Sequence, residues 1–259
     1  MLRKLDSLLG FKVQGKEDEL GKVSDFYFDQ DKFILRYLVI DTGKWLKHEL
    51  TLVSTDAFEK IDFKNENVIV NLTAEELEES PSLDKNKPIS KIMEEKVVRH
   101  FEWPLYWASS NISGSPSIPA GTLKREKLFA YDNLTDEEKQ QEEEEVESNL
   151  RSFKEIKGYH IHAVDKKFGH LEDLFVDEED WVIRYLLIDT RNILPGKHVL
   201  IAPEWISHIS WNKEDIFVNK SKKEIKKAPE YREERSDYLV DKDYEKKLHD
   251  HYDEDICWR

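Results

Sequence analysis

The chain has 259 residues, a formal net charge of −15 and one cysteine, Cys257. The negative charge argues against nucleic-acid binding and against an anionic membrane surface, because both require basic patches on the protein. A single cysteine excludes an intrachain disulfide and a thiolate metal cluster, and it favours a reducing, cytoplasmic compartment.

The N-terminal residues include basic side chains but no apolar stretch follows them, so we expect no secretion signal. No apolar run approaches the ~20 residues that cross a bilayer, and we expect no direct membrane insertion. Residues 1–71 alternate short apolar runs with turns, which is typical of β-strands. A charged loop between Gly15 and Gly21 predicts a hairpin, and residues 33–42 predict a central strand that is apolar on both faces.

Helical patterns follow these strands. Residues 89–101 carry apolar side chains at helical spacing and predict a helix that packs on the strands. Residues 103–121 are aromatic at first and then loop-like, and the acid-rich residues 134–148 predict a solvated linker. A second set of strands is expected from about residue 151 to 219, with a final helix around 241–252.

The chain contains one long pattern twice. Residues 33–42 read FILRYLVIDT, and residues 181–190 read WVIRYLLIDT. The match extends on both sides, so the repeat unit covers about residues 1–107 and 149–259. We expect each copy to close on itself as a small β-barrel with its own trailing helix.

The residues that the two copies share resemble the PRC-barrel family, which is named after the cytoplasmic domain of the photosynthetic reaction centre H subunit. The pattern is a glycine, an apolar residue and an aspartate on one strand, then a tyrosine and an apolar–aspartate end on the next. Its carriers are Gly21, Val23, Asp25, Tyr37, Ile40 and Asp41 in copy one, and Gly169, Leu171, Asp173, Tyr185, Ile188 and Asp189 in copy two. The resemblance implies a mainly β fold with added helices: two tandem small PRC-type β-barrels, each followed by a helix.

The repeat sets the expected domain boundaries. We predict PRC-barrel repeat 1 at residues 1–80, a helix and aromatic segment at 81–107, a loop and acidic linker at 108–148, repeat 2 at 149–230, and a C-terminal helix and tail at 231–259. Arg36 and Arg184 interrupt an apolar strand face, and we expect each to form an ion pair with Asp25 or Asp173.

The resemblance implies roles without catalysis: a scaffold for electron and proton transfer, or a docking surface for a ribosomal protein. The sequence contains no phosphate-binding glycine loop, nucleophile elbow or His-Glu-x-x-His motif. We therefore predict a scaffold or adaptor that is not an enzyme, carries no cofactor, self-associates and contacts an unidentified protein partner. Two alternatives stay open. One is a ligand- or metal-binding module with a proton- or electron-transfer role like the H subunit, and the other is docking like a ribosome-maturation factor.

No metal site is predicted, but three histidines are the candidates should one exist. His160 and His162 share a face of a predicted strand, and His170 is expected on the neighbouring strand. A metal needs three or four converging ligands, so polar residues on a solvated strand face are the favoured interpretation.

Two further pairs recur at equivalent positions. For His48 and His198 we favour a capping or packing role over a ligand role. Asp41 and Asp189 end a strand before a turn, where bonding to the local backbone is more common than catalysis.

Aromatic residues are the candidates for a partner surface. They are Trp103, Tyr106, Trp107 and Trp258. Packing in the core or between the copies is the favoured alternative for the first three, because an exposed aromatic group is what marks an interaction surface.

Overall fold

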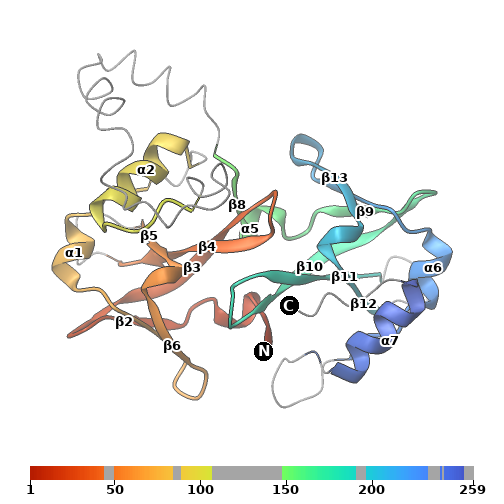
Figure 1. Ribbon diagram of the computed structural model, residues 1–259, viewed down its shortest axis with the longest axis horizontal. Coiled ribbons are helices and arrows are strands. Elements are labelled where there is room, and N and C mark those ends of the chain that lie inside the picture. Colours follow the sequence, from red (N-terminus) through yellow and green to blue (C-terminus); the bar gives the residue numbers. More distant parts are fainter. Residues whose placement is uncertain are drawn as a thin grey trace, which may run out of the picture. The chain divides into compact units, whose positions relative to one another are not determined.

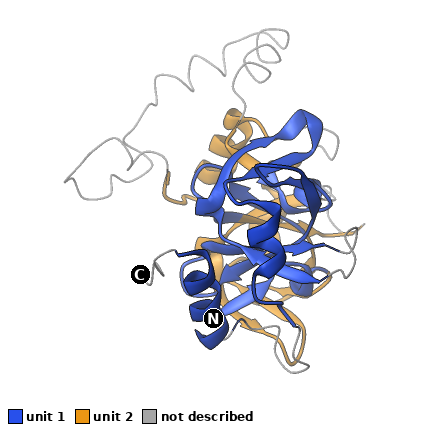
Figure 2. Ribbon diagram, turned by 90° about the vertical axis from the view of Figure 1, so that its right-hand side faces the viewer, with its two compact units in different colours: residues 1–9, 25–36, 151–259 blue, residues 10–24, 37–150 orange. Residues whose placement is uncertain are grey.

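The computed structural model describes residues 1–43, 50–83, 89–106, 148–190, 197–232, 240 and 242–253. Strands dominate this part of the chain and form two seven-stranded sheets, to which short helices are added (Figure 1). The predicted mainly β fold of two tandem β domains with helices is therefore confirmed. The chain divides into two compact units (Figure 2): residues 1–9, 25–36 and 151–259 form unit 1, and residues 10–24 and 37–150 form unit 2.

The sheet of the first copy has the strand order β5 (Leu50–Ser54), β4 (Ile34–Asp41), β3 (Glu19–Asp29), β2 (Lys12–Gln14), β7 (Asn67–Val70) and β6 (Phe58–Asp62). The sheet of the second copy has the order β12 (His198–Ile201), β11 (Ile183–Asp189), β10 (Lys167–Asp177), β9 (His160–His162), β14 (Asp215–Val218) and β13 (Ile206–Ser210). The two orders are the same when the strands are numbered within each copy. In both sheets the strand after the first turn pairs parallel with the last strand, β2 with β7 and β9 with β14.

Among the described residues, the helices are α1 (Ala74–Glu78), α2 (Lys91–His100), α5 (Phe153–Ile156), α6 (Lys222–Lys227) and α7 (Lys242–Tyr252). Single 3-10 turns occur at Asp6–Leu8, Thr55–Ala57, Pro203–Trp205 and Trp211–Lys213. The helices α2 and α7 confirm the two trailing helices that apolar spacing predicted. Within the described residues, no helix is both long and apolar enough to cross a bilayer.

Equivalent polar contacts fix each trailing helix to the short helix of its own copy. Nε2 of His100 on α2 donates to the carbonyl oxygen of Glu76 on α1, and Nε2 of His251 on α7 donates to that of Glu224 on α6, both at 2.8 Å. A carbonyl only accepts, so the ring nitrogen must carry the proton in both cases. Glu76 also forms a capping box with Thr73, and Glu224 forms one with Ser221. Both copies therefore share this helix start.

The first strands of the two copies are exchanged. Strand β1 (Leu2–Lys4) of copy one pairs antiparallel with β10 of copy two, and β8 (Leu150–Ser152) of copy two pairs with β3 of copy one. The expectation that each copy closes on itself is wrong for these strands. A three-residue strand carries too little pattern to specify which of two similar sheets it joins, so the exchange was not visible in the sequence.

The aspartates of the shared pattern bind the start of the exchanged segments. Oδ1 of Asp173 accepts the N–H of Asp6 at 3.2 Å, just after β1. In the equivalent place Oδ1 of Asp25 accepts the N–H of Lys154 at 3.1 Å, and its Oδ2 accepts the hydroxyl of Ser152 at 2.5 Å. Each aspartate therefore ties the entry segment of one copy to the long strand of the other.

The hairpin ends of the two copies also bond to each other inside unit 1. The N–H of Leu35 donates to the carbonyl of Trp181 at 2.8 Å, and the N–H of Ile183 donates to the carbonyl of Phe33 at 2.7 Å. Phe33 and Trp181 have left-handed backbones, with φ of 52° and 59°, which bulky side chains rarely adopt. The same strained backbone in both copies presents both carbonyls to the opposite strand.

Arg36 and Arg184 do not pair with Asp25 or Asp173, so this expectation from the sequence is wrong. Arg36 lies 3.7 Å from Asp29, and Arg184 lies 3.7 Å from Asp177 and also contacts Asp180. These partners lie at the turn of each hairpin. Asp25 and Asp173 instead accept hydrogen bonds from backbone N–H groups, and Asp25 also accepts one from the Ser152 hydroxyl.

Candidate functional site

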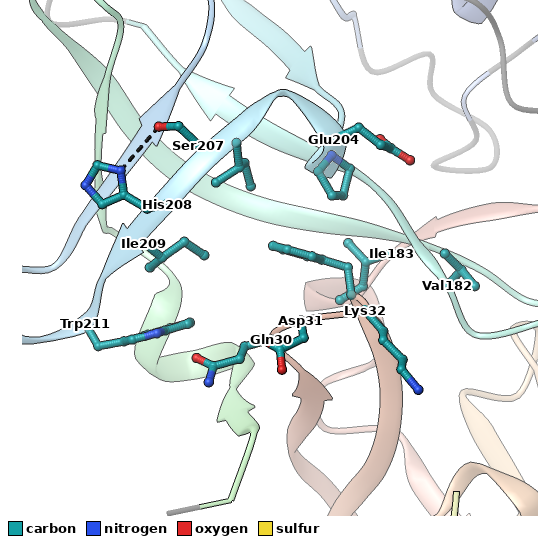
Figure 3. Close-up of a pocket in the computed structure, with 13 residues that line it drawn as sticks. Gln30, Asp31, Lys32, Val182, Ile183, Glu204, Ser207, His208, Ile209 and Trp211 are labelled. Carbon is teal, nitrogen blue, oxygen red and sulfur yellow. Dashed lines mark hydrogen bonds between the residues drawn. The ribbon is translucent and has the colours of Figure 1, made fainter. Parts of the chain in front are cut away.

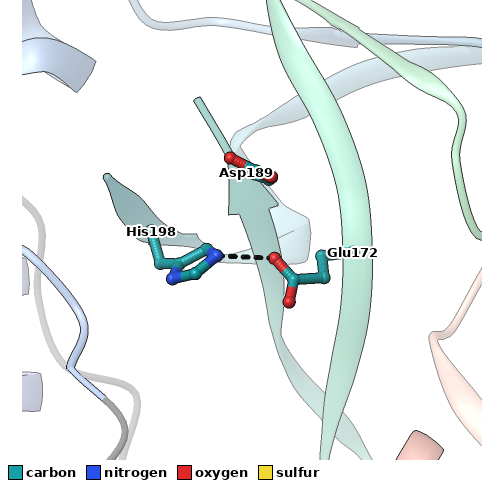
Figure 4. A group of neighbouring side chains, drawn as sticks. All are labelled: Glu172, Asp189 and His198. Carbon is teal, nitrogen blue, oxygen red and sulfur yellow. Dashed lines mark ion pairs between the residues drawn. The ribbon is translucent and has the colours of Figure 1, made fainter. Parts of the chain in front are cut away.

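A row of polar side chains crosses three neighbouring strands of the second copy. Asp189 on β11 lies opposite His170 on β10 and opposite His198 on β12. Residues directly opposite in antiparallel strands share a face, with Cβ atoms about 5 Å apart. Glu172 on β10 joins the row, and Figure 4 shows its carboxylate directed at the ring of His198. We call His170, Glu172, Asp189 and His198 the His–carboxylate cluster.

The ligand atoms of the cluster lie close together. Nε2 of His198 is 2.7 Å from Oε2 of Glu172, and Nε2 of His170 is 3.8 Å from Oδ2 of Asp189. Glu172, Asp189 and His198 each offer one ligand atom, and these atoms lie within 4.8 Å of one another. Asp189 is buried, whereas the other three side chains are about one third exposed. Imidazole nitrogens and carboxylate oxygens thus converge where a small ion can enter from solvent.

Hydrogen bonds at the loop ends hold Asp189 and His198 side by side. The N–H and hydroxyl of Thr190 donate to the carbonyl of Lys197 at 3.1 and 2.7 Å, and the N–H of Lys197 donates back to the Thr190 hydroxyl at 2.9 Å. The Lys197 ammonium donates to the carbonyl of Ala228, and burial lowers the pKa of this ammonium. The residues that flank the cluster are therefore fixed by contacts outside it.

The shared glycine lets the neighbouring strand approach. A Cβ at Gly169 would lie 2.3 Å from the carbonyl oxygen of Asp189, and a Cβ at Gly21 would lie 2.3 Å from that of Asp41. Any side chain at either position would push the strands apart. The glycine of the family pattern consequently sets the position of the aspartate at the strand end.

Copy one has a different set of side chains at the same place. Lys22 and Ser24 stand at the positions of His170 and Glu172. Asp41 is exposed and its Oδ1 accepts the N–H of Gly43 at 2.9 Å, which confirms the predicted backbone role for this aspartate. His48 lies outside the described residues.

The three histidines singled out in the sequence lie on neighbouring strands, as expected. His160 and His162 are on β9, and His170 on β10 lies opposite His160. Nε2 of His162 is 2.8 Å from Oδ1 of Asp215, and its ring stacks on Phe217 with centroids 4.7 Å apart. The close group of three ligand atoms found among the described residues includes neither His160 nor His162.

A groove of ≈530 Å³ lies beside the second sheet, within unit 1. Its apolar lining includes the half-exposed side chains of Phe33, Ile206, Ile209 and Trp211. Figure 3 shows Ile183, Ile209 and Trp211 around the hollow, with the hairpin-end residues Gln30, Asp31 and Lys32 on another side. The groove therefore combines an apolar lining with a polar rim, along the strand β13.

Copy one buries a tyrosine–carboxylate pair between a strand and its trailing helix. The Tyr37 hydroxyl donates to Oε1 of Glu94 at 3.1 Å, and Nζ of Lys91 donates to Oε2 at 3.0 Å. Burial raises the pKa of Glu94, against the opposing effects of Lys91, Tyr106 and Tyr37, which hydrogen-bond to it. The fully buried carboxyl is thus the acceptor that joins α2 to β4.

Copy two repeats this pair with an additional histidine. The Tyr185 hydroxyl lies 2.9 Å from Nε2 of His249 and also hydrogen-bonds to Glu245, both on α7. Burial raises the pKa of Tyr185, and Glu245 adds to the effect. Burial likewise raises the pKa of Glu245. This tyrosine has two partners on the helix.

The aromatic residues proposed as a partner surface are partly accounted for by packing. Trp103 is buried and stacks on Phe101 with centroids 4.3 Å apart. Tyr106 hydrogen-bonds to Glu94, and its ring centroid is 5.5 Å from the Lys91 ammonium. Trp103 therefore belongs to the core, the alternative that the sequence favoured. Trp107 and Trp258 lie outside the described residues.

Comparison with protein-family models matches residues 2–77 to the PRC-barrel domain. The match runs from β1 to α1 and includes the pattern residues Gly21, Asp25 and Tyr37. The resemblance drawn from the sequence is confirmed by this match, and the second sheet has the same strand order. A search of curated proteins found no match to the chain.

Proposed function

With a PRC-barrel domain as the premise, we propose that the chain is a non-enzymatic scaffold or adaptor that binds an extended segment of a partner protein in the unit 1 groove. The observation that carries the proposal is a hollow lined by half-exposed apolar side chains along an edge strand. Strand β13 ends its sheet, and in the described part of the chain its pairing partner is β14. Extended peptides bind by adding to such edges while alternate side chains fill a pocket.

The equivalent edge of copy one is protected by charge. Strand β6 carries Glu59 and Lys60 where β13 has Ser207 and His208, and all four residues are exposed. Charged side chains on an edge strand oppose pairing with another chain. Because β13 lacks this charged pair, the comparison supports copy two as the partner-binding edge.

The rim favours a segment with both apolar and basic side chains. Asp31 and Glu204 line the groove with carboxylates, and Lys32 supplies one opposing charge. The net charge of −15 adds a long-range attraction for basic segments. Apolar side chains of the segment would fill the space between Ile209 and Trp211.

A displayed library of random linear peptides tests this function on the purified full-length protein. We expect enrichment of extended apolar–basic sequences, and about tenfold weaker binding, or ~1.4 kcal/mol, in the double variant S207E/H208K. This variant carries the residues that copy one has at the same edge. The matched control E59S/K60H changes copy one and should bind as the original chain does. Failure to enrich any sequence, or equal binding by S207E/H208K, contradicts the proposal.

Sedimentation of the same proteins tests self-association through the same edge. If the occupant of β13 is a second copy of the chain, the original protein dimerises and S207E/H208K is monomeric. A monomer at all concentrations contradicts self-association while leaving the peptide result to decide the adaptor role.

A further inference from the structure

We propose that the His–carboxylate cluster of the second copy binds one zinc ion. None of its four residues lines the groove, so the inference stands independently of the peptide-binding function. The cluster belongs to unit 1 entirely, on strands β10, β11 and β12.

The spacing of the ligand atoms suits a small divalent cation. Zinc bonds to nitrogen and oxygen of about 2.0–2.2 Å put neighbouring ligand atoms about 3.3 Å apart in a tetrahedron. The separations within Glu172, Asp189 and His198 start at 2.7 Å and do not exceed 4.8 Å, so they bracket this distance. His170, at 3.8 Å from Asp189, supplies a fourth ligand from the same strand as Glu172.

The closest pair of atoms in the cluster is not joined by a hydrogen bond. Oε2 of Glu172 and Nε2 of His198 are buried atoms that approach to 2.7 Å as an ion pair, yet neither has a hydrogen-bond partner among the described residues. A buried acceptor or ring nitrogen that makes no hydrogen bond destabilises the fold, because it has lost its contacts with water. A cation coordinated by both atoms uses both lone pairs, which makes this pair the strongest single indication of an ion.

The chemistry of the four side chains selects the ion. Two imidazoles and two carboxylates form a nitrogen–oxygen set that is typical of zinc, whereas magnesium and calcium prefer oxygen ligands. His198 and Asp189 come from strand ends that the Thr190–Lys197 hydrogen bonds hold together. The side chains of His170 and His198 are about one third exposed, so the cluster lies near the protein surface.

Copy one provides an internal contrast. At the positions of His170 and Glu172 it has Lys22 and Ser24, so one imidazole is replaced by an ammonium and one carboxylate by a hydroxyl. Asp41 directs its carboxylate to the N–H of Gly43. The substitution H170K/E172S therefore introduces residues that the same fold already accepts at these positions.

Zinc titration of the chelator-treated full-length protein, by calorimetry and by competition with a chromophoric chelator, tests the site. We expect one saturable site per chain, and binding at least about tenfold weaker in H198A and in H170K/E172S. H162A is the matched control, because His162 pairs with Asp215 on the same sheet, and it should bind zinc unchanged. Magnesium in excess should not displace the zinc.

Folding of each variant is checked by circular dichroism, and zinc-dependent thermal stabilisation of the unmodified chain gives a second readout that needs no variant. The proposal is overturned if the unmodified chain shows no saturable site. It is equally overturned if H170K/E172S, correctly folded, binds zinc as tightly as the unmodified chain, or if H162A alone abolishes binding.

Discussion

The ends of strands β4 and β11 are equivalent places in the two copies, and they have different surroundings. Asp41 is exposed and bonds to the next turn, whereas Asp189 is buried beside His170. The close approach of the neighbouring strand is alike in both, because Gly21 and Gly169 carry no side chain that would prevent it. The duplication has thus kept the residues that fix the strands while the polar side chains between them have changed.

The edge strands β6 and β13 of the two copies also differ in their polar side chains. Copy one has charged residues on β6, and copy two has uncharged residues on β13 beside the groove. Both candidate functional features, the His–carboxylate cluster and the groove, therefore use residues of copy two whose counterparts in copy one are unsuited to the task. The comparison supports our proposal that copy two, rather than copy one, carries the partner edge and the metal site.

The largest effect is expected at the buried carboxyl groups that join each trailing helix to its sheet. Glu94→Ala removes the acceptor that the buried Tyr37 shares with the half-buried Lys91 and Tyr106, so we expect a loss of about 3–5 kcal/mol in the free energy of unfolding. Glu245→Ala should cost about 1–2 kcal/mol less, because Tyr185 keeps His249 as a partner. Urea unfolding measures both, and equal losses would contradict this account of the two helices.

The shared glycines give the next largest effect. Gly21→Ala introduces a clash with the Asp41 carbonyl at a φ of 142°, so we expect a loss of roughly 3 kcal/mol. Gly169→Ala has the same clash at 2.3 Å without the positive φ and should cost about 1 kcal/mol less. Thermal unfolding compares the two variants, and a larger loss for Gly169→Ala would reverse the prediction.

Asp173 and Asp25, the aspartates of the shared pattern, are expected to differ in their response to pH. Burial raises the pKa of Asp173 to about 7, so its protonated form is favoured in the folded state. Protonated Asp173 therefore contributes its full stability to the fold below the unfolded pKa of about 4. This contribution is lost as the pH rises through 7, because the buried side chain must then ionise. Asp173→Asn should therefore be about 2–3 kcal/mol more stable than the original chain at pH 8 and nearly equal at pH 4.

Asp25→Asn is the comparison for this experiment. Burial raises the pKa of Asp25 too, but the Ser152 hydroxyl and two backbone N–H groups oppose the rise, so a smaller pH dependence is expected. Unfolding curves between pH 4 and pH 8 measure both. A flat difference between Asp173→Asn and the original chain would show that Asp173 is ionised in the folded protein throughout this range.

The smallest effect concerns the exchanged strand β8. Ser152 caps α5 through the N–H of Glu155 and donates to Asp25, so Ser152→Ala should cost about 1–2 kcal/mol. The loss should shrink to about 0.5–1 kcal/mol in the Asp25→Asn background, because the two residues share one bond. Additive losses in the double variant would argue against the contact between β8 and β3.

Much of the architecture follows from local pattern. The hairpins, the central strands and the two trailing helices are predictable because apolar spacing and turn residues specify them within a short stretch of sequence. The capping boxes at Thr73 and Ser221 are visible for the same reason. The exchange of β1 and β8 is not, because a three-residue strand fits either of two similar sheets.

The cluster could be predicted only in part. The sequence indicates three of its residues as separate candidates: His170, Asp189 and His198. It does not group them, because the cross-strand register that brings them together depends on pairing between distant residues. Glu172 was missed, since a single glutamate on a strand carries no signal of its own. The two copies differ at this position, Ser24 in copy one and Glu172 in copy two, within an otherwise similar stretch. This difference could have indicated a role for Glu172 that copy one lacks.

Native mass spectrometry of the zinc-loaded full-length chain tests the divergence of the copies most directly, because it counts ions per chain. The account predicts one zinc ion in the original protein and none in folded H170K/E172S. Two zinc ions per chain would show that copy one binds zinc as well. One zinc ion retained by H170K/E172S would show that the ion binds outside the His–carboxylate cluster. Either result contradicts the proposal that only copy two has a zinc site.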